Sequence, residues 1–374
     1  MLLTDCRSAM KTDSIMKRLT VIVPTYNMET LLPQCLDSIL QSTLLAAVEV
    51  IVVNDGSTDG SLGVALDYER RYPDVVRVID KPNGNYGSTV NVALPIATGE
   101  YVRLLDADDC FNVARLGEYI EFLQRMSGVD MVVSPFVEAG KYGEHYVDYD
   151  IYSRRKYEYG VEYDADKVFG DGIIRFFMMH SVAYRTDLLR EMGYRQSEGI
   201  SYTDQEWVFY PLFHVRSIAF ADIPLYRYNL AREGQTMDYE VQLRSIGQLV
   251  TLTENMATYF AKAPKRRMSA TRVTFLREIV KNRMRIVLRK YLLEMSNRQF
   301  ASSDFVEVYG RLLRLAGQCG IGAIDVPVNN RLKVDLLERW LRYGHRHSAF
   351  SRFVLRNLDS LMTRVYVKIF RRMK

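Results

Sequence analysis

The chain lacks several features that would mark it as secreted, disulfide-bonded or membrane-spanning. It has only four cysteines in 374 residues, and their spacing fits neither a metal site nor a redox motif. No apolar run approaches the roughly 18–20 residues that a transmembrane helix requires, and residues 1–17 lack the apolar block of a secretory signal. We therefore expect reduced thiols in a cytoplasmic protein, with a disordered leader over residues 1–17.

The sequence has no strong excess of charge of either sign, but basic residues gather toward its C-terminus. The net charge is +5, while residues 262–290 hold eleven Lys or Arg against Glu278, and residues 339–374 hold ten against Asp359. Residues 350–373 have the pattern of a basic amphipathic helix, which favours attachment to an anionic membrane surface. A basic face packed on the rest of the protein and an oligomer interface are the alternatives. No nucleic-acid-binding motif accompanies the charge, so no nucleic acid is expected as a partner.

Strand-like and helix-like segments alternate from residue 18 to about residue 133. The apolar runs are continuous, which is typical of parallel strands covered by helices on both faces. The pattern predicts an α/β domain with a doubly wound, mostly parallel sheet. We expect strands at 19–26, 48–55, 75–80, 101–106 and 129–134, and helices at 31–40, 62–72, 87–97 and 113–126.

The rest of the chain has a different pattern. Residues 135–160 are rich in Tyr, Gly and charge, which predicts a hairpin insertion or a mobile loop. Further strands are expected around residues 218–228, and strand signals vanish beyond about residue 238. We therefore divide the chain into a catalytic domain at 18–237 and a basic, helical C-terminal domain at 238–374.

Polar residues cluster where three of the predicted strands end. Pro24-Thr25-Tyr26-Asn27 and Asn54-Asp55-Gly56-Ser57 follow the first two strands, and Asp106, Asp108 and Asp109 follow the fourth. Ligands bind at the carboxyl ends of strands in such sheets, and carboxylates there can hold Mg²⁺ or Mn²⁺ beside substrate phosphates. Each segment alone could be a plain turn or helix cap. Together they indicate a nucleotide site, in which Asp55 accepts a hydrogen bond from a nucleobase N–H.

Four segments in order make the chain resemble the family 2 inverting glycosyltransferases, which have the GT-A nucleotide-diphospho-sugar transferase fold. The resemblance covers residues 18–237 and implies a nucleotide-sugar donor and a Mn or Mg ion. It is carried by VIVPTYNMETLLPQCLDSIL, VEVIVVNDGSTDGS, NGNYGSTVNVALPIATGEYVRLLDADD and SYTDQEW.

The resemblance implies roles for residues of the first three segments. It assigns Asp106 to the ribose and the metal, Asp108 to the metal that bridges the diphosphate, and Asp109 to capping the next helix. Many members carry Arg-Asn where this chain has Val90-Asn91, which leaves the base contacts open. We expect the nucleotide-sugar to be bound by Pro24, Thr25, Tyr26, Asp55 and Asn83. Lys81 and Gly87 lie nearby and could contribute hydrogen-bond donors.

Later segments supply the closing loop and the base. The segment LAREGQTM resembles the loop that closes over the donor, so Arg232 and Gln235 are expected at the pyrophosphate, with a solvated loop as the alternative. Asp204 aligns with the general base that deprotonates the acceptor hydroxyl, and Glu206 is a second candidate. A capping box that starts at Thr203 is the structural alternative for this segment.

Two aromatic side chains have both a functional and a structural interpretation. Trp207 could wall the sugar site, and His180 could approach the acceptor, although both residue types are commonly structural.

These observations predict a metal-dependent inverting glycosyltransferase of hexosyltransferase type. It would move a sugar from a nucleotide-sugar, by expectation a UDP-sugar, to the hydroxyl of a saccharide or lipid-linked saccharide. The resemblance places it in bacterial surface polysaccharide synthesis, in the cytoplasm or peripherally on the inner face of the membrane. Transfer to polyprenyl phosphate, nucleotidyl transfer and a non-catalytic nucleotide-binding role are the alternatives.

Overall fold

The computed structural model describes residues 16–140, 143–148, 157–174, 176–230, 245–266, 268–291, 304–322 and 324. The chain divides into two compact units. The sheet unit comprises Met1–Gly199 and His214–Ala231, and the helical unit comprises Ile200–Phe213 and Arg232–Lys374. The predicted domains followed chain order with a boundary at 237/238, whereas the segment that contains Asp204 groups with the helices. Most of the predicted leader lies outside the described residues.

The sheet unit is built on an eight-stranded sheet in the order β3-β2-β1-β4-β10-β6-β11-β9. The four strands from β3 to β4 are mutually parallel, β10 is antiparallel to both neighbours, and β9 is antiparallel at the edge. The predicted doubly wound, mostly parallel sheet is confirmed. The strands are β1 (Leu19–Thr25), β2 (Val48–Asp55), β3 (Val76–Lys81), β4 (Tyr101–Leu104), β6 (Met131–Val133), β9 (Glu162–Asp164), β10 (Val182–Arg185) and β11 (Ser217–Phe220).

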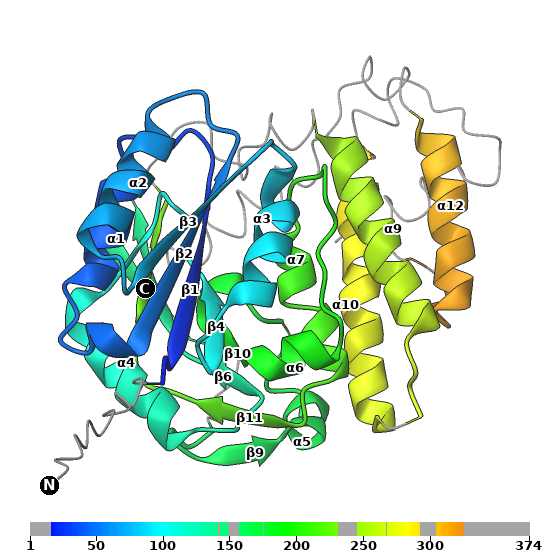
Figure 1. Cartoon of the computed structure of the whole chain (residues 1–374). Helices are drawn as coiled ribbons and strands as arrows, with labels where there is room; N and C mark the ends of the chain where they lie inside the picture. The colour runs from blue at the N-terminus through cyan, green and yellow to red at the C-terminus, as the bar shows by residue number, and fades with distance from the viewer. Residues whose placement is uncertain are drawn as a thin grey trace, which may run out of the picture. The chain divides into compact units, whose positions relative to one another are not determined.

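Helices cover both faces of the parallel strands, which explains why every residue of β2 is buried. Figure 1 shows α1 (Leu32–Leu40), α2 (Ser61–Arg71) and α4 (Val113–Arg125) on one side of β1–β3, and α3 (Asn85–Ala93) on the other. These bounds agree with the predicted helices to within a turn. The shorter helices of this unit are η1 (Leu45–Ala47), η2 (Leu94–Ile96), α5 (Ala165–Gly170), η3 (Met179–Ser181) and α6 (Thr186–Glu191).

A second, four-stranded sheet in the order β5-β12-β7-β8 borders the first. It contains β5 (Cys110–Phe111), β7 (Phe136–Gly140), β8 (Gly143–Val147) and β12 (Tyr226–Asn229). Strands β7 and β8 pair antiparallel, so the hairpin predicted after residue 135 is confirmed. Because β5 and β12 also pair, the chain just after the acidic loop is anchored to a strand more than a hundred residues later.

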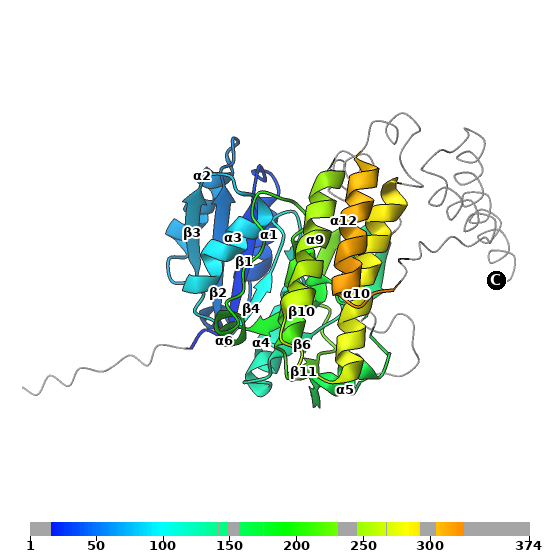
Figure 2. The same ribbon diagram turned by 90° about the vertical axis from the view of Figure 1, so that its right-hand side faces the viewer.

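The described part of the helical unit has no strands, as the sequence predicted. Figure 2 shows α9 (Ile246–Lys262), α10 (Ala270–Arg289) and α12 (Phe305–Gln318) side by side. The unit also holds α7 (Asp204–Trp207) and η4 (Tyr210–Phe213). None of the described helices has the length and apolar character needed to cross a membrane. The predicted amphipathic helix at 350–373 lies outside the described residues.

Candidate functional site

The carboxyl ends of three neighbouring parallel strands bring the predicted donor-binding residues to one edge of the sheet. Strand β1 ends at Thr25, and β2 ends at Asp55. Asp106 follows two residues after the end of β4. Because β2, β1 and β4 are adjacent in the sheet, these side chains share that edge.

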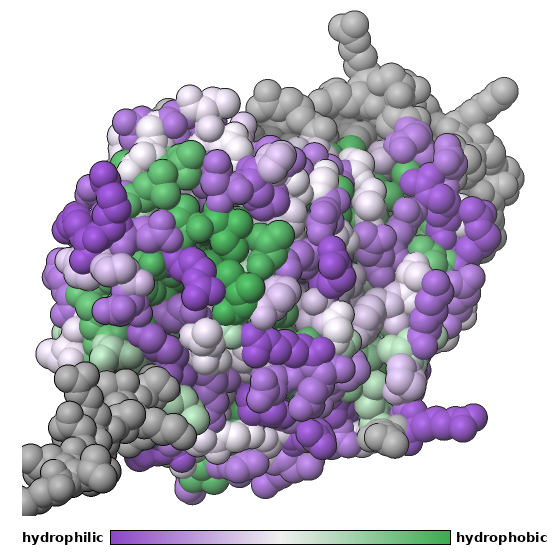
Figure 3. Space-filling view, in the orientation of Figure 1, coloured by the Kyte–Doolittle hydropathy of each residue, from purple (hydrophilic) through white to green (hydrophobic). Residues whose placement is uncertain are grey.

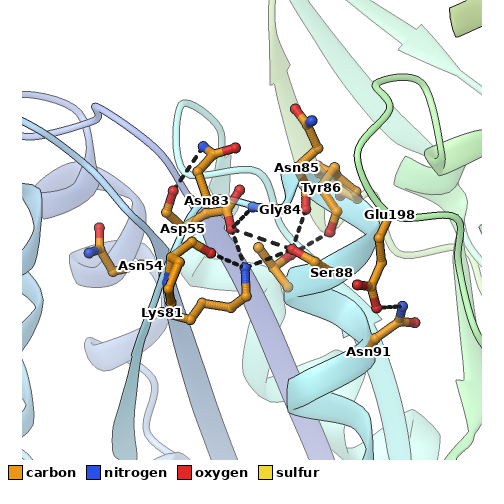
Figure 4. A network of polar contacts seen from close by, with 12 residues as sticks. Asn54, Asp55, Lys81, Asn83, Gly84, Asn85, Tyr86, Ser88, Asn91 and Glu198 are labelled. Carbon is orange, nitrogen blue, oxygen red and sulfur yellow. Dashed lines mark hydrogen bonds and ion pairs between the residues drawn. The ribbon is translucent and has the colours of Figure 1, made fainter.

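Asp55 is held in a network of donors from β3 and the start of α3 (Figure 4). The ammonium of Lys81 donates to Oδ1 of Asp55 (2.5 Å), and the N–H of Gly84 donates to the same oxygen (3.0 Å). The Ser88 hydroxyl approaches Oδ1 at 3.4 Å and accepts from Lys81 (2.8 Å). Asn83 donates its side-chain amide to the backbone carbonyl of Asp55 (2.9 Å). Every donor described on the Asp55 carboxylate therefore reaches Oδ1.

The first predicted segment differs in accessibility from residue to residue. Pro24 is half-buried. Thr25 is 1% exposed, and its hydroxyl donates to the carbonyl of Val23 (3.2 Å). Tyr26 is 47% exposed. The tyrosine ring is thus accessible, as is Asn27, whereas the threonine hydroxyl proton is already used within the strand.

Helix α3 connects the Asp55 network to the acidic loop. The phenol of Tyr86 donates to Oδ1 of Asp106 (2.8 Å) from the first turn of α3. Further along α3, Asn91 donates to the carbonyl of Gln196 (2.9 Å) and to Glu198 (2.8 Å). Helix α3 therefore contacts both Asp55 at the end of β2 and Asp106 after β4. It also binds the segment around residues 196–198.

Gly87 has a packing role at the start of α3. A Cβ added at this position would overlap the backbone oxygen of Ser197 and come within 2.9 Å of the Gln196 Cβ. Only glycine permits this approach of α3 to residues 196–197.

Asp109 fastens the acidic loop to β12 instead of capping the following helix. Tyr226 donates its phenol to Oδ2 of Asp109 (2.6 Å), and the N–H of Asn229 donates to Oδ1 (2.7 Å). Helix α4 begins after Asn112, with no side-chain cap. The predicted capping role is wrong, because the pairing of β5 with β12 brings strand donors to this carboxylate. Burial raises the pKa of Asp109 above its ordinary value.

The acidic loop carries carboxylates of the kind that bind a hard divalent cation. Asp106 and Asp108 are half-buried, whereas Asp109 is 2% exposed and both of its oxygens accept hydrogen bonds. One ligand atom from each of Asp106, Asp109 and His180 also lies within 4.8 Å of the other two. Carboxylate oxygens are ligands that Mg²⁺ and Mn²⁺ prefer. Both oxygens of Asp109 already accept hydrogen bonds, and Oδ1 of Asp106 accepts one from Tyr86.

His180 is buried among aromatic rings. Its ring stacks on Tyr228 (4.3 Å between centroids) and lies 4.7 Å from Tyr226 and 5.1 Å from Phe136. Among the described residues no hydrogen-bond partner reaches its Nδ1. Burial, with a contribution from Arg103, lowers the pKa of His180 to about 3, so the imidazole is neutral at physiological pH.

Asp204 occupies a second polar centre, within the helical unit. Gln205 donates its side-chain amide to Oδ2 of Asp204 (2.7 Å), and Arg283 of α10 donates to the Gln205 side-chain oxygen. Burial raises the pKa of Asp204 to about 6, against the opposing effects of Gln205 and Arg283.

The neighbours of Asp204 have structural surroundings. Glu206 and Trp207 are fully buried, and Glu206 accepts a hydrogen bond from Tyr210 (2.9 Å). Thr203 makes no side-chain cap, so the capping-box alternative is not met.

Some predicted residues are not placed, and some contributors were not predicted. Arg232 and Gln235 lie outside the described residues. Tyr86, Ser88 and Arg283 were not assigned roles from the sequence. The first two lie inside the NGNYGS segment that carries the resemblance, directly after a strand, and that position is the signal that could have found them.

The fold defined by this sheet is that of known GT-A enzymes. The chain superposes on S. aureus TarS 1–349 in complex with UDP, with a TM-score of 0.63 and 20% identity, over 88% of each chain. At that identity the likeness shows the fold. Residues 20–193 match the family model of glycosyl transferase family 2.

Curated relatives match mainly shorter parts of the chain. A Mycoplasma pneumoniae protein described as an uncharacterized glycosyltransferase is 39% identical over 31% of this chain and 38% of its own length. The Bacillus subtilis putative glycosyltransferase EpsH is 26% identical over 66% of this chain and 70% of its own length. The poly(ribitol-phosphate) beta-glucosyltransferase of Bacillus spizizenii is 36% identical over 28% of this chain and 17% of its own length. The chain thus spans well under half of the first and third of these relatives.

Proposed function

We propose that this protein is a metal-dependent inverting glycosyltransferase of hexosyltransferase type, which transfers a sugar from a UDP-sugar to a saccharide hydroxyl. The observation that carries the proposal is the pair of braced carboxylates, Asp55 and Asp106, at the ends of the two strands that flank β1, in a chain that matches the family 2 model. Helix α3 holds both, so a nucleotide base and a diphosphate could be bound without reorganisation of the edge.

The hydrogen bonds that Asp55 already accepts favour uracil over guanine as the base that it binds. Lys81 and Gly84 both bind Oδ1, which leaves Oδ2 as the oxygen to which no described donor is directed. Uracil presents one imide N–H, which a single carboxylate oxygen satisfies, whereas guanine presents two adjacent N–H donors that match both oxygens of a carboxylate. The complexes of S. aureus TarS with UDP and UDP-GlcNAc support the same choice.

Asp106 and Asp108 would hold the divalent ion in the proposed enzyme. When bound, such an ion neutralises charge on the departing diphosphate. Asp109 contributes by keeping the loop on β12, and Tyr86 by fixing the orientation of the Asp106 carboxylate.

Asp204 is the proposed general base. It is half-buried, and its pKa of about 6 leaves it ionised at neutral pH but more basic than an ordinary aspartate. The acceptor hydroxyl would give its proton to this carboxylate as its oxygen attacks the anomeric carbon opposite the leaving diphosphate. Glu206 is less suited, because it is fully buried and already accepts a hydrogen bond from Tyr210.

The names of relatives support a setting in surface polysaccharide synthesis. They include the minor teichoic acid biosynthesis protein GgaB of Bacillus subtilis and the poly(ribitol-phosphate) beta-glucosyltransferase.

A saccharide or lipid-linked saccharide acceptor at the inner face of the membrane suits the basic residues of 262–290. Hydrophilic side chains predominate over the helical unit on the face shown in Figure 3. We expect the protein to sediment with anionic phosphatidylglycerol vesicles in a salt-sensitive manner, but not with zwitterionic phosphatidylcholine vesicles.

The test is a product assay with UDP-sugars and Mn²⁺. Transfer or hydrolysis at the anomeric carbon releases UDP, whereas nucleotidyl transfer releases pyrophosphate. We expect UDP release that chelation of the metal abolishes. Asp108→Ala should lose metal-dependent donor binding, and Asp204→Asn should bind donor but not turn it over. Release of pyrophosphate, or turnover that survives both substitutions, would refute the proposal.

A further inference from the structure

Asp204, Gln205 and Arg283 form a linear hydrogen-bonded chain inside the helical unit. The guanidinium of Arg283 donates to the Gln205 side-chain oxygen, and the Gln205 amide donates to Oδ2 of Asp204 (2.7 Å). No described ion pair joins Arg283 to Asp204 directly, so glutamine is the connecting group.

The chemistry of arginine determines which way the glutamine amide points. A guanidinium has only donors, so it can bind Gln205 only through the amide oxygen. The NH₂ group must then face Asp204, which as a carboxylate has only acceptors. The reversed amide would place donor against donor and acceptor against acceptor. Arg283 thereby fixes the orientation of a side chain that would otherwise have two.

The charged groups around Asp204 act in opposite directions. Burial disfavours the ionised carboxylate, whereas the positive charge of Arg283 favours it. Burial raises the pKa of Tyr202, just before α7, and the nearby Asp204 charge adds to that rise. Glu206, on the same short helix, is directed to Tyr210. Arg283 is therefore a cation that compensates the Asp204 charge. Burial lowers the pKa of Arg283, and the nearby Asp204 carboxylate opposes that lowering.

We infer that Arg283 is a positioning residue for Asp204, which acts through Gln205 to hold the carboxylate ionised and in one orientation toward the acceptor. The inference rests on the proposed function, in which Asp204 is the base. It assigns to helix α10 a part in the reaction, although this helix lies beyond the residues that match the family model.

The first test needs no substrate. Thermal unfolding of Arg283→Met, Asp204→Asn and the double variant is followed at pH 5 and pH 8. The folded-state pKa of Asp204 lies above the ordinary value, so its ionisation destabilises the native state as the pH rises through about 6. Without Arg283 this penalty should grow. We expect Arg283→Met to lower the melting temperature more at pH 8 than at pH 5, and Asp204→Asn to remove that difference.

A matched control separates this coupling from a general effect of charge on α10. Arg289→Met makes the same substitution at an exposed position of the same helix, and its effect should not depend on Asp204. An equal loss for Arg283→Met at both pH values, unrelieved by Asp204→Asn, would mean that Arg283 only packs, and the inference would be wrong.

The second test is the pH dependence of UDP release from a consumed UDP-sugar. Arg283→Met should move the acid limb of kcat/KM to higher pH by about one pH unit, which is about a fivefold loss at pH 6 and about a tenfold loss well below pH 6 that recovers at alkaline pH. The donor KM should not change, and Arg283→Lys should restore part of the acid limb. Full turnover by Asp204→Asn would refute the assignment of Asp204 as the base in the proposed function, whereas an unshifted profile in an enzyme that needs Asp204 would refute the role of Arg283 alone.

Discussion

The phenol of Tyr86 donates to the carboxylate of Asp106 across 2.8 Å, and so joins the first turn of α3 to the acidic loop after β4. One turn of the same helix also supplies Ser88 to the Asp55 network. A disturbance of α3 should therefore affect base binding and metal binding together.

Tyr86→Phe should weaken metal-dependent donor binding with little change in fold. Loss of one hydrogen bond to a charged group costs about 2 kcal/mol, so we expect the Mn²⁺ requirement for UDP binding to rise by an order of magnitude or more. Calorimetric titration of UDP at several Mn²⁺ concentrations measures this effect. Tyr146→Phe removes an equivalent phenol from the exposed hairpin, where it donates to Asp222 (3.2 Å), and should bind as the wild type does. Equal affinities for all three proteins would contradict the bracing role.

Lys81→Met should destabilise the protein because it leaves Asp55 without its counter-charge. The two side chains are 17% and 4% exposed, and breaking such a buried pair costs about 3 kcal/mol. Urea denaturation measures the free energy of unfolding, and Asp55→Asn in the same background should recover part of the loss. Arg70→Met breaks the exposed pair with Asp67 and should change stability by less than about 1 kcal/mol. A similar cost for both substitutions would show that burial of the Asp55 pair is unimportant.

Gly87→Ala should be strongly destabilising, whereas Gly63→Ala should be neutral or stabilising. A Cβ at Gly87 would overlap the Ser197 backbone oxygen, while a Cβ at Gly63 meets nothing within 4 Å. Both glycines lie inside helices, so alanine gains about 1 kcal/mol of helix propensity at each. Steric overlap should reverse the sign at Gly87 alone, by about 2 kcal/mol or more. Thermal unfolding of the two variants decides, and a stable Gly87→Ala protein would disprove the close approach.

The rate of sugar transfer should rise with pH through about 6 and then level off. Asp204 must be ionised to accept a proton, and burial raises its pKa to about 6. Asp204→Asn should lower kcat by about a thousandfold without changing donor affinity. Glu206→Gln can still accept from Tyr210 and should keep most of the activity. If Glu206→Gln were inactive and Asp204→Asn active, the two roles would have to be exchanged.

The sequence was sufficient to predict the order of the strands and helices and to predict which residues meet at the carboxyl edge of the sheet. Continuous apolar runs identify strands such as β2 because burial on both faces excludes polar residues. Thr25, Asp55 and Asp106 could be grouped in advance, because adjacent parallel strands must end at the same edge. The role of Asp109 could not, since its partners on β12 are more than a hundred residues away.

Residue order along this chain determined which segments become strands and helices, and which carboxylates terminate the strands, because hydrophobic periodicity and turn chemistry act over a few residues. Only the tertiary structure decided which donors reach those carboxylates: Lys81 at Asp55, Tyr86 at Asp106, and Arg283 through Gln205 at Asp204. The physical reason is that a hydrogen bond forms only at a narrow range of donor–acceptor distances and angles. Packing between segments that are distant in the sequence sets these distances and angles.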